Sequence, residues 1–165
     1  MALFRPKEKL QIFTDLNTDK LKEKGFDTVL LDIDNTIAVP DTGICDERAK
    51  AFIEKLKSEG FKVAIFSNNT KKRVKMFLNG MDVDYVYFAL KPLPFQYWRA
   101  CLMLKSKPEK TVVLGDQLLT DITGANLSGC YGIYCKQLME KDTPMTSVNR
   151  QVEKLIWRYI LNDKV

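Results

Sequence analysis

The sequence predicts an α/β fold, a Rossmann-like three-layer sandwich in which helices cover both faces of a central parallel sheet. Strand-like and helix-like segments alternate along the chain. The strand-like segments are also continuous apolar runs, which is typical of parallel strands buried on both faces. With 165 residues and 45% hydrophobic content, the chain suits one compact domain over residues 1–165.

The first half of the chain shows this alternation. Residues 17–25 start with an Asn-Thr pair that can cap a helix and end with a Gly that can stop it. Residues 29–31, Val-Leu-Leu, form a short apolar strand. Residues 46–60 begin with a capping Asp, carry apolar residues at helical spacing and end in Gly, so they predict a helix that packs on a sheet. Residues 61–66 supply the next strand.

The second half repeats the same rhythm. Apolar residues at helical spacing and further apolar runs predict helices over 71–78, 95–104 and 120–127, and strands over 85–89, 111–114 and 131–134.

A last helix is predicted from a long apolar stripe near the C-terminus. The stripe consists of Val148, Val152, Leu155, Ile156, Tyr159 and Ile160, and the opposite face carries Arg150, Lys154 and Arg158. We expect the stripe to pack on the sheet; a surface for a partner or a membrane is the alternative.

Composition excludes several kinds of protein. No apolar run approaches the roughly 20 residues of a membrane span, and the N-terminus lacks the apolar core of a signal peptide, so a cytoplasmic protein is expected. The four cysteines show no zinc-binding spacing and are expected to be free thiols. The chain has no histidine, which excludes Ser-His-Asp and Cys-His nucleophile systems. Carboxylates, Lys, Ser or Thr and a hard metal ion remain for chemistry.

Polar residues gather where the predicted strands end. In an open parallel sheet the active site lies beyond the carboxyl ends of the strands. The residues found there are Asp32, Asp34, Ser67, Asn68, Lys91 and Asp116, with Asp121 opening the following helix. An Asp-rich turn without function would explain the first pair alone. It does not explain why four strand ends carry such groups.

The set suits the transfer of a phosphoryl group to a carboxylate. Asp32, Asp34 and Asp116 can hold Mg²⁺ through oxygen atoms. Ser67 and Lys91 can bind the phosphoryl oxygens. One acid can attack as the nucleophile while a second protonates the leaving oxygen and later activates water. The spacing alone leaves open which acid takes which part.

In this order, the residues resemble the four motifs of the haloacid dehalogenase (HAD) superfamily. The matching segments are Asp32-x-Asp34-x-Thr36, Ser67-Asn68, Lys91-Pro92 and Gly115-Asp116-x4-Asp121. The resemblance implies that Asp32 is the nucleophile and Asp34 the general acid and base. It also implies that Ser67, Asn68 and Lys91 bind substrate, that Asp116 is a Mg²⁺ ligand, and that Asp121 supports the metal site or Lys91.

Two insertion points that carry cap domains in this superfamily are short here. They hold only the loop 37–45 and the helix 71–78, so the resemblance implies a HAD-like domain with no substantial cap and an open site. The segments 32–36, 115–121 and 149–153 more closely resemble the YqeG family of type III phosphatases, which is similar to phosphatidylglycerophosphate phosphatases. Asn35 stands where many superfamily members have Gly.

The sequence therefore predicts a Mg²⁺-dependent phosphomonoester phosphatase that works through an aspartyl phosphate. Two alternatives belong to other classes. One is a phospho-accepting regulator, which also combines acids, a hydroxyl and a Lys at strand ends. The other is a binding or assembly protein that keeps the acids only as a cation site.

An open site predicts a large substrate or a covering partner, because the site cannot enclose a small metabolite by itself. The net charge of +5 has a solvated surface as its simplest explanation, and attraction to anions as the alternative. The basic face Arg150, Lys154 and Arg158 and the Lys and Arg residues near the N-terminus, together with the family resemblance, favour a phosphorylated lipid head group such as phosphatidylglycerophosphate, reached by peripheral contact with the inner face of an anionic membrane. A phosphorylated macromolecule or nucleotide-type substrate ranks second. No specific nucleic-acid binding is predicted, and an oligomer is compatible with the sequence.

Overall fold

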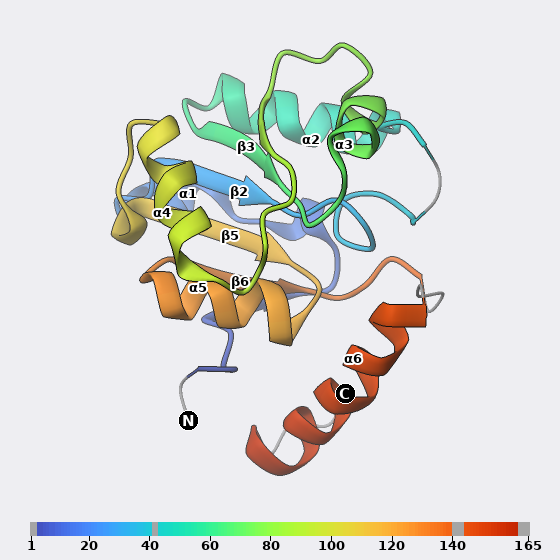
Figure 1. Ribbon diagram of the computed structural model, residues 1–165. Coiled ribbons are helices and arrows are strands. Elements are labelled where there is room, and N and C mark those ends of the chain that lie inside the picture. The colour runs from blue at the N-terminus through green and yellow to red at the C-terminus, as the bar shows by residue number, and fades with distance from the viewer. Residues whose placement is uncertain (1–2, 41–42, 140–143, 162–165) are drawn as a thin grey trace.

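Six parallel strands form one sheet in the computed structural model, which describes residues 3–40, 43–139 and 144–161, with the backbone alone for 144–148 and 150. The spatial order is β1-β6-β5-β2-β3-β4 (Figure 1). The strands are β1 (Glu8–Leu10), β2 (Thr28–Leu31), β3 (Lys62–Phe66), β4 (Asp84–Val86), β5 (Thr111–Gly115) and β6 (Tyr131–Cys135). Because all pairings are parallel, the carboxyl ends of the strands meet at one edge, here called the carboxyl edge.

Helices cover both faces of this sheet, as the sequence predicted. One face carries α1 (Thr18–Glu23), α2 (Glu47–Ser58) and α3 (Lys71–Leu78); the other carries α4 (Pro94–Met103) and α5 (Thr123–Ser128) (Figure 1). A π-helical turn, Leu118–Ile122, leads into α5. The helix α6 (Pro144–Leu155) and a second π-helical turn, Ile156–Ile160, follow β6. The predicted α/β fold is confirmed, and no cap domain is present in the described parts of the chain.

β2 lies between β3 and β5, and its side chains are completely buried. Leu31 is in register with Ile65 of β3 and with Leu114 of β5. Asp32, Ser67 and Asp116 therefore leave three neighbouring strands at nearly the same level of the carboxyl edge. Parallel pairing thus brings together side chains that are far apart in the sequence.

The two faces of β2 contribute to two separate apolar layers. Val29 and Leu31 lie in the layer beneath α1, α2 and α3, and Leu30 lies in the layer beneath α4 and α5. In the second layer the rings of Phe66 and Tyr97 pack with centroids 4.5 Å apart. Burial on both faces explains why the strand sequences are continuous apolar runs.

Three local features differ from the predictions. β1 was not predicted, because its Glu-Lys-Leu sequence is too polar to indicate a strand. β4 ends at Val86, whereas a strand to residue 89 was expected; Phe88 and Leu90 have φ values of +43° and +51°, which no strand accommodates. Helical structure begins at Leu118 in π form, two residues before the predicted start.

The prediction that the C-terminal apolar stripe packs on the sheet is only partly right. Ile156 is buried, together with Trp157 and Leu161, mainly against the π-helical turn 118–122. Val152, Leu155 and Tyr159 are exposed. Figure 1 shows α6 outside the three layers. The side chains of Val148 and Arg150 lie outside the described residues.

Membrane-spanning structure is not indicated by the helices. Within the described part of the chain, no helix is both long enough and apolar enough to cross a bilayer.

Glu8 fixes the edge strand β1 to its surroundings. Its Oε1 accepts hydrogen bonds from Lys24 Nζ at 2.8 Å and from the Tyr131 hydroxyl at 2.9 Å. Burial acts to raise the pKa of Glu8, but the bonds from Lys24, Tyr131 and Lys20 outweigh it and lower the pKa to about 2.

We therefore expect Glu8→Gln to reduce the free energy of unfolding by about 1 kcal/mol at pH 7, after allowance for solvent screening. A lowered pKa stabilises the fold fully above the ordinary pKa of 4.5, and this contribution is lost as pH falls toward 2. Urea unfolding of both proteins at pH 7 and pH 3 tests this. A difference that is constant with pH would contradict the assignment.

Candidate active site

A buried ammonium group lies at the centre of the carboxyl edge. Lys91 Nζ is 2.6 Å from Asp32 Oδ1 and 2.6 Å from Asp121 Oδ1. The side chain of Lys91 is only 3% exposed. The three groups come from the end of β2, the segment between β4 and α4, and the π-helical turn before α5. One lysine therefore joins three separate parts of the chain.

The charges in this cluster depend on one another. Burial raises the pKa of Asp32 to about 7; the charge of Lys91 opposes this rise, and the charge of Asp121 adds to it. Burial acts to lower the pKa of Lys91, but the carboxylates of Asp121 and Asp32 outweigh burial and raise that pKa above its ordinary value. The lysine therefore remains charged and is shared by the two acids.

The second oxygen of Asp32 faces another carboxylate. The Thr36 hydroxyl lies 3.3 Å from Asp32 Oδ2 and 3.1 Å from Asp116 Oδ1. Asp32, Asp116 and Asp121 each offer a carboxylate oxygen within 4.8 Å of the others, and all three residues are buried. Asp121 is already committed, because Lys91 binds one of its oxygens and the Gln117 amide donates to the other at 3.2 Å. Asp32 and Asp116 are therefore the members of this buried acidic group that we consider as ligands of a divalent cation.

The carboxylate of Asp34 is not part of this cluster. Its Oδ1 is 2.8 Å from Nη2 of Arg73, and its Oδ2 accepts a hydrogen bond from the Asn69 side chain at 2.5 Å. The structure thus brings Asp121 into the acidic cluster, where the sequence had placed Asp34 beside Asp32 and Asp116 as a metal ligand. Asp34 lies on the other side of the site, next to α3.

Ser67 is linked to the Asp34 side of the site through Asn69. Its Oγ accepts hydrogen bonds from the Asn69 backbone at 3.2 Å and the Asn69 side chain at 3.0 Å. Its own hydroxyl hydrogen remains available to a ligand, because no bond that it donates is recorded among the described residues. Ser67 is 1% exposed and comes directly after β3.

Asn68 braces the segment that carries Lys91. Its side chain accepts a hydrogen bond from the Lys91 amide at 2.8 Å and donates to the Lys91 carbonyl at 3.4 Å. The backbone of Phe88 and Ala89 also bonds to Asn69 and Ser67. The chain after β4 is therefore held against the chain after β3, although it has left the sheet. The side chain of Asn68, which the sequence predicted to bind substrate, thus holds the backbone of Lys91 in this structure.

Asn35 adopts a left-handed conformation, with φ at +62°. Asn is among the few residues other than Gly that tolerate this region, which explains why it can stand where many superfamily members have Gly. The backbone amide of Asn35 donates to the Ala38 carbonyl at 2.7 Å, and its side-chain oxygen accepts a hydrogen bond from the backbone amide of Met139 at 3.1 Å. The loop beside Asp32 is thereby closed and tied to the chain after β6.

The sequence missed two residues of the site. They are Arg73 and Asn69, neither of which the sequence marked as a candidate site residue. A signal for Arg73 does exist, because it lies in the first turn of α3, and Thr70 caps that helix at the carboxyl edge. Arg73 is also the one arginine beside Lys71, Lys72 and Lys75, but that difference alone does not indicate a contact with Asp34.

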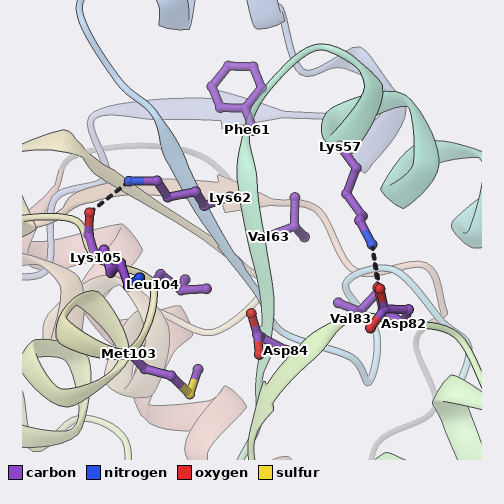
Figure 2. A pocket seen from close by; sticks show the side chains of 10 residues that line it. All are labelled: Lys57, Phe61, Lys62, Val63, Asp82, Val83, Asp84, Met103, Leu104 and Lys105. Atoms are coloured by element: carbon purple, nitrogen blue, oxygen red, sulfur yellow. Dashed lines mark hydrogen bonds and ion pairs between the residues drawn. The ribbon is translucent and has the colours of Figure 1, made fainter.

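A second concave region lies at the opposite edge of the sheet. Figure 2 shows this cavity of about 470 Å³, which is bounded by the first residues of β3 and β4 and by the end of α4. Its lysines already have partners: Lys57 is 3.9 Å from an oxygen of Asp82, and Lys62 donates to the Lys105 carbonyl at 2.7 Å. No group of carboxylates converges there among the described residues, so the carboxyl edge remains the candidate active site.

Comparisons with known proteins agree with this placement. A family model described as haloacid dehalogenase-like hydrolase matches residues 4–129. A curated protein of Bacillus subtilis (strain 168), described as "Probable phosphatase YqeG", is 36% identical over 153 residues, which cover 93% of this chain and 89% of the relative. The chain therefore belongs to the haloacid dehalogenase-like hydrolases. Within that family it is an enzyme of the phosphatase type, as the sequence predicted.

Solved structures support the fold. An uncharacterized protein from Listeria monocytogenes serotype 4b has a TM-score of 0.55 at 22% identity, covering 78% of this chain and 97% of its own. The cobalt-bound deoxy-D-mannose-octulosonate 8-phosphate phosphatase of Haemophilus influenzae has a TM-score of 0.56 at 13% identity, covering 83% of this chain and 90% of its own. At these identities the likeness shows the shared HAD-like fold.

Gly115 allows Asp121 to reach Lys91. A Cβ atom at position 115 would lie 2.2 Å from Asp121 Cγ, which is well inside van der Waals contact. We expect Gly115→Ala to displace Asp121 and to lower the free energy of unfolding by about 1–3 kcal/mol.

The matched control is Gly132→Ala in the nearby strand β6, where the new Cβ would meet the Ala125 Cβ at 3.2 Å and needs only a small adjustment. Denaturant unfolding of both variants tests the prediction. Equal losses of stability would show that the close approach to Asp121 has no special cost.

Proposed function

We propose that the protein is a Mg²⁺-dependent phosphomonoester phosphatase in which Asp32 forms an aspartyl phosphate. One observation carries the proposal. One oxygen of Asp32 lies 2.6 Å from the buried ammonium of Lys91. Its other oxygen is on the side of Asp116, and the Thr36 hydroxyl bridges the two acids. A carboxylate between a buried ammonium and a site that would hold a divalent cation is suited to approach a phosphate dianion.

The remaining residues take complementary parts. Lys91 and Ser67 hold the phosphoryl oxygens while an oxygen of Asp32 forms a bond to phosphorus. Asp34 gives a proton to the leaving oxygen as the ester bond breaks. It then takes a proton from the water that attacks the aspartyl phosphate, which releases inorganic phosphate and restores Asp32. Asp121 holds Lys91 in place.

The donor set fits Mg²⁺. Oxygen atoms of Asp32 and Asp116 converge, both residues are buried, and a hard cation prefers carboxylate oxygen. When bound, the ion would offset the negative charge of the acids and of the phosphate. We assign the ion to Asp32 and Asp116, and we assign the Asp34 side chain to proton transfer.

Sustained turnover of p-nitrophenyl phosphate in the presence of Mg²⁺ tests the proposal, because a phospho-accepting regulator or a binding protein would give none. We expect Asp32→Asn to remove turnover, since the amide keeps the shape without the nucleophilic oxygen. Asp116→Asn should instead increase the Mg²⁺ concentration needed for half-maximal rate. Near-normal turnover in Asp32→Asn would contradict the role of Asp32.

For the substrate we propose a phosphorylated lipid head group such as phosphatidylglycerophosphate, met at the cytoplasmic face of an anionic membrane. The support is an apolar rim beside Lys91, formed by Phe88, Leu90, Leu93 and Phe95, each about half exposed. A bilayer could cover the open site and take up these side chains.

Charge near the rim agrees with an anionic surface. The chain has no acidic residue between Glu59 and Asp82 or between Asp84 and Glu109. Lys71 and Lys72 are exposed at the start of α3, and the Lys71 ammonium lies 5.5 Å from the centre of the Tyr87 ring beside the rim. Attraction of about 1 kcal/mol per well-placed charge would orient the carboxyl edge toward the membrane.

We expect the double variant Leu93→Ser with Phe95→Ser to bind anionic vesicles about 10- to 100-fold more weakly, because two apolar side chains no longer enter the bilayer. Turnover of p-nitrophenyl phosphate should change little. Leu102→Ser is the control: Leu102 is 76% exposed on the same helix, near the opposite edge of the sheet. Vesicle sedimentation measures the affinity, and equal binding by all three proteins would contradict membrane contact through the rim.

A further inference from the structure

Arg73 is a nearly buried guanidinium beside the active site. Its side chain is 15% exposed, whereas Lys71, Lys72 and Lys75 on the same helix are exposed. Nη1 donates to the Gly43 carbonyl at 2.9 Å, and Nη2 lies 2.8 Å from Asp34 Oδ1. The two nitrogens therefore connect the loop after Asp32 to the carboxylate of Asp34.

Both oxygens of Asp34 are held, but by unlike groups. Oδ1 meets a guanidinium, which keeps its protons at all physiological pH values. Oδ2 meets the Asn69 amide at 2.5 Å, and that same amide lies 3.0 Å from the Ser67 hydroxyl. Oδ2 is thus the oxygen on the side of Ser67, and Oδ1 is the oxygen on the side of α3.

We propose that Arg73 is a positioning residue for proton transfer: it fixes the Asp34 carboxylate so that Oδ2 faces the leaving group and carries the proton. The inference rests on the proposed phosphatase function and adds a residue to it. An Asp side chain that is 31% exposed would otherwise turn between rotamers. The guanidinium occupies Oδ1 and anchors itself on the Gly43 carbonyl, which removes that freedom.

The proton balance is the same in both halves of the reaction. In the first half, the Oδ2–H bond of Asp34 breaks and its proton joins the ester oxygen while the phosphorus bond to that oxygen breaks and Asp32 is phosphorylated. In the second half, water gives a proton to Oδ2 and its oxygen bonds to phosphorus as the bond to Asp32 breaks. Arg73 gains and loses no proton in either half, so it takes no part in the transfer itself and acts through its contact with Oδ1 of Asp34.

A double-mutant cycle between Arg73 and Asp34 distinguishes this role from simple structural support. The proteins are the wild type, Arg73→Met, Asp34→Asn and the double variant. The substrates are p-nitrophenyl phosphate, whose leaving group needs no proton, and an alkyl phosphate such as 2-glycerophosphate, whose leaving group does. We expect Arg73→Met to lower kcat on the alkyl phosphate by about 10- to 100-fold and on the aryl phosphate by less than about 3-fold.

In the Asp34→Asn background, Arg73→Met should cause no further loss of kcat on either substrate, because position 34 then has no carboxylic acid for Arg73 to orient. Arg73→Lys keeps the charge but cannot reach both the Gly43 carbonyl and Oδ1 of Asp34, so its loss of kcat on the alkyl phosphate should be intermediate. The Lys variant can replace the Met variant if the latter does not fold. Lys75→Met removes an exposed charge from the same helix and should match the wild type.

The outcomes separate the inference from the function on which it rests. An inactive wild type would overturn the phosphatase assignment and, with it, the role of Arg73. An active wild type in which Arg73→Met loses equal activity on both substrates would overturn only the positioning role. The same conclusion would follow if the losses at positions 34 and 73 simply multiplied in the double variant.

Discussion

The site depends on one buried ammonium shared by two carboxylates. Removing Lys91 from water is unfavourable, and two bonds of 2.6 Å to Asp32 and Asp121 offset that cost. Loss of one partner would leave a buried charge uncompensated, which typically costs about 3–5 kcal/mol. The end of β2, the segment after β4 and the turn before α5 are therefore held together by charge as well as by apolar packing.

This arrangement divides the site into two sides. One side, to which the proposed function assigns the cation, contains Asp32, Asp116 and Thr36. The other side, to which it assigns proton transfer, contains Asp34, Asn69 and Arg73. The division explains why two acids only two positions apart can differ in role: Asp32 lies among carboxylates, and Asp34 lies beside a guanidinium. Segments that follow neighbouring strands supply most of the contacts that set these two environments.

The sequence predicted those parts of the molecule that depend on local pattern. Apolar runs indicated the central strands, and helical spacing indicated α2, α3 and α4. The strand ends indicated Asp32, Ser67, Lys91 and Asp116, because parallel pairing brings such ends together in any sheet of this kind. The fold class could therefore be predicted before any contact was known.

Features that depend on the partner of a residue could not be predicted in this way. β1 is a strand only because β6 offers it an edge, and its own sequence is polar. Arg73 is marked out from the lysines beside it chiefly by its contacts with Asp34 and Gly43. The C-terminal stripe indicated a helix correctly, but the same pattern fits packing on a sheet or on the π-helical turn 118–122. In each case the deciding contact is distant in sequence.

The order of strands in the sheet also bears on how the chain folds as it is synthesised. A nascent chain that ends at Lys110 already contains Asp32, Ser67 and Lys91, but it lacks β5 and with it Asp116 and Asp121. One edge of β2 is then unpaired, as in the exposed strands to which chaperones bind. β1 must wait still longer, because its partner β6 follows β5. The first strand to leave the ribosome is therefore the last to join the sheet.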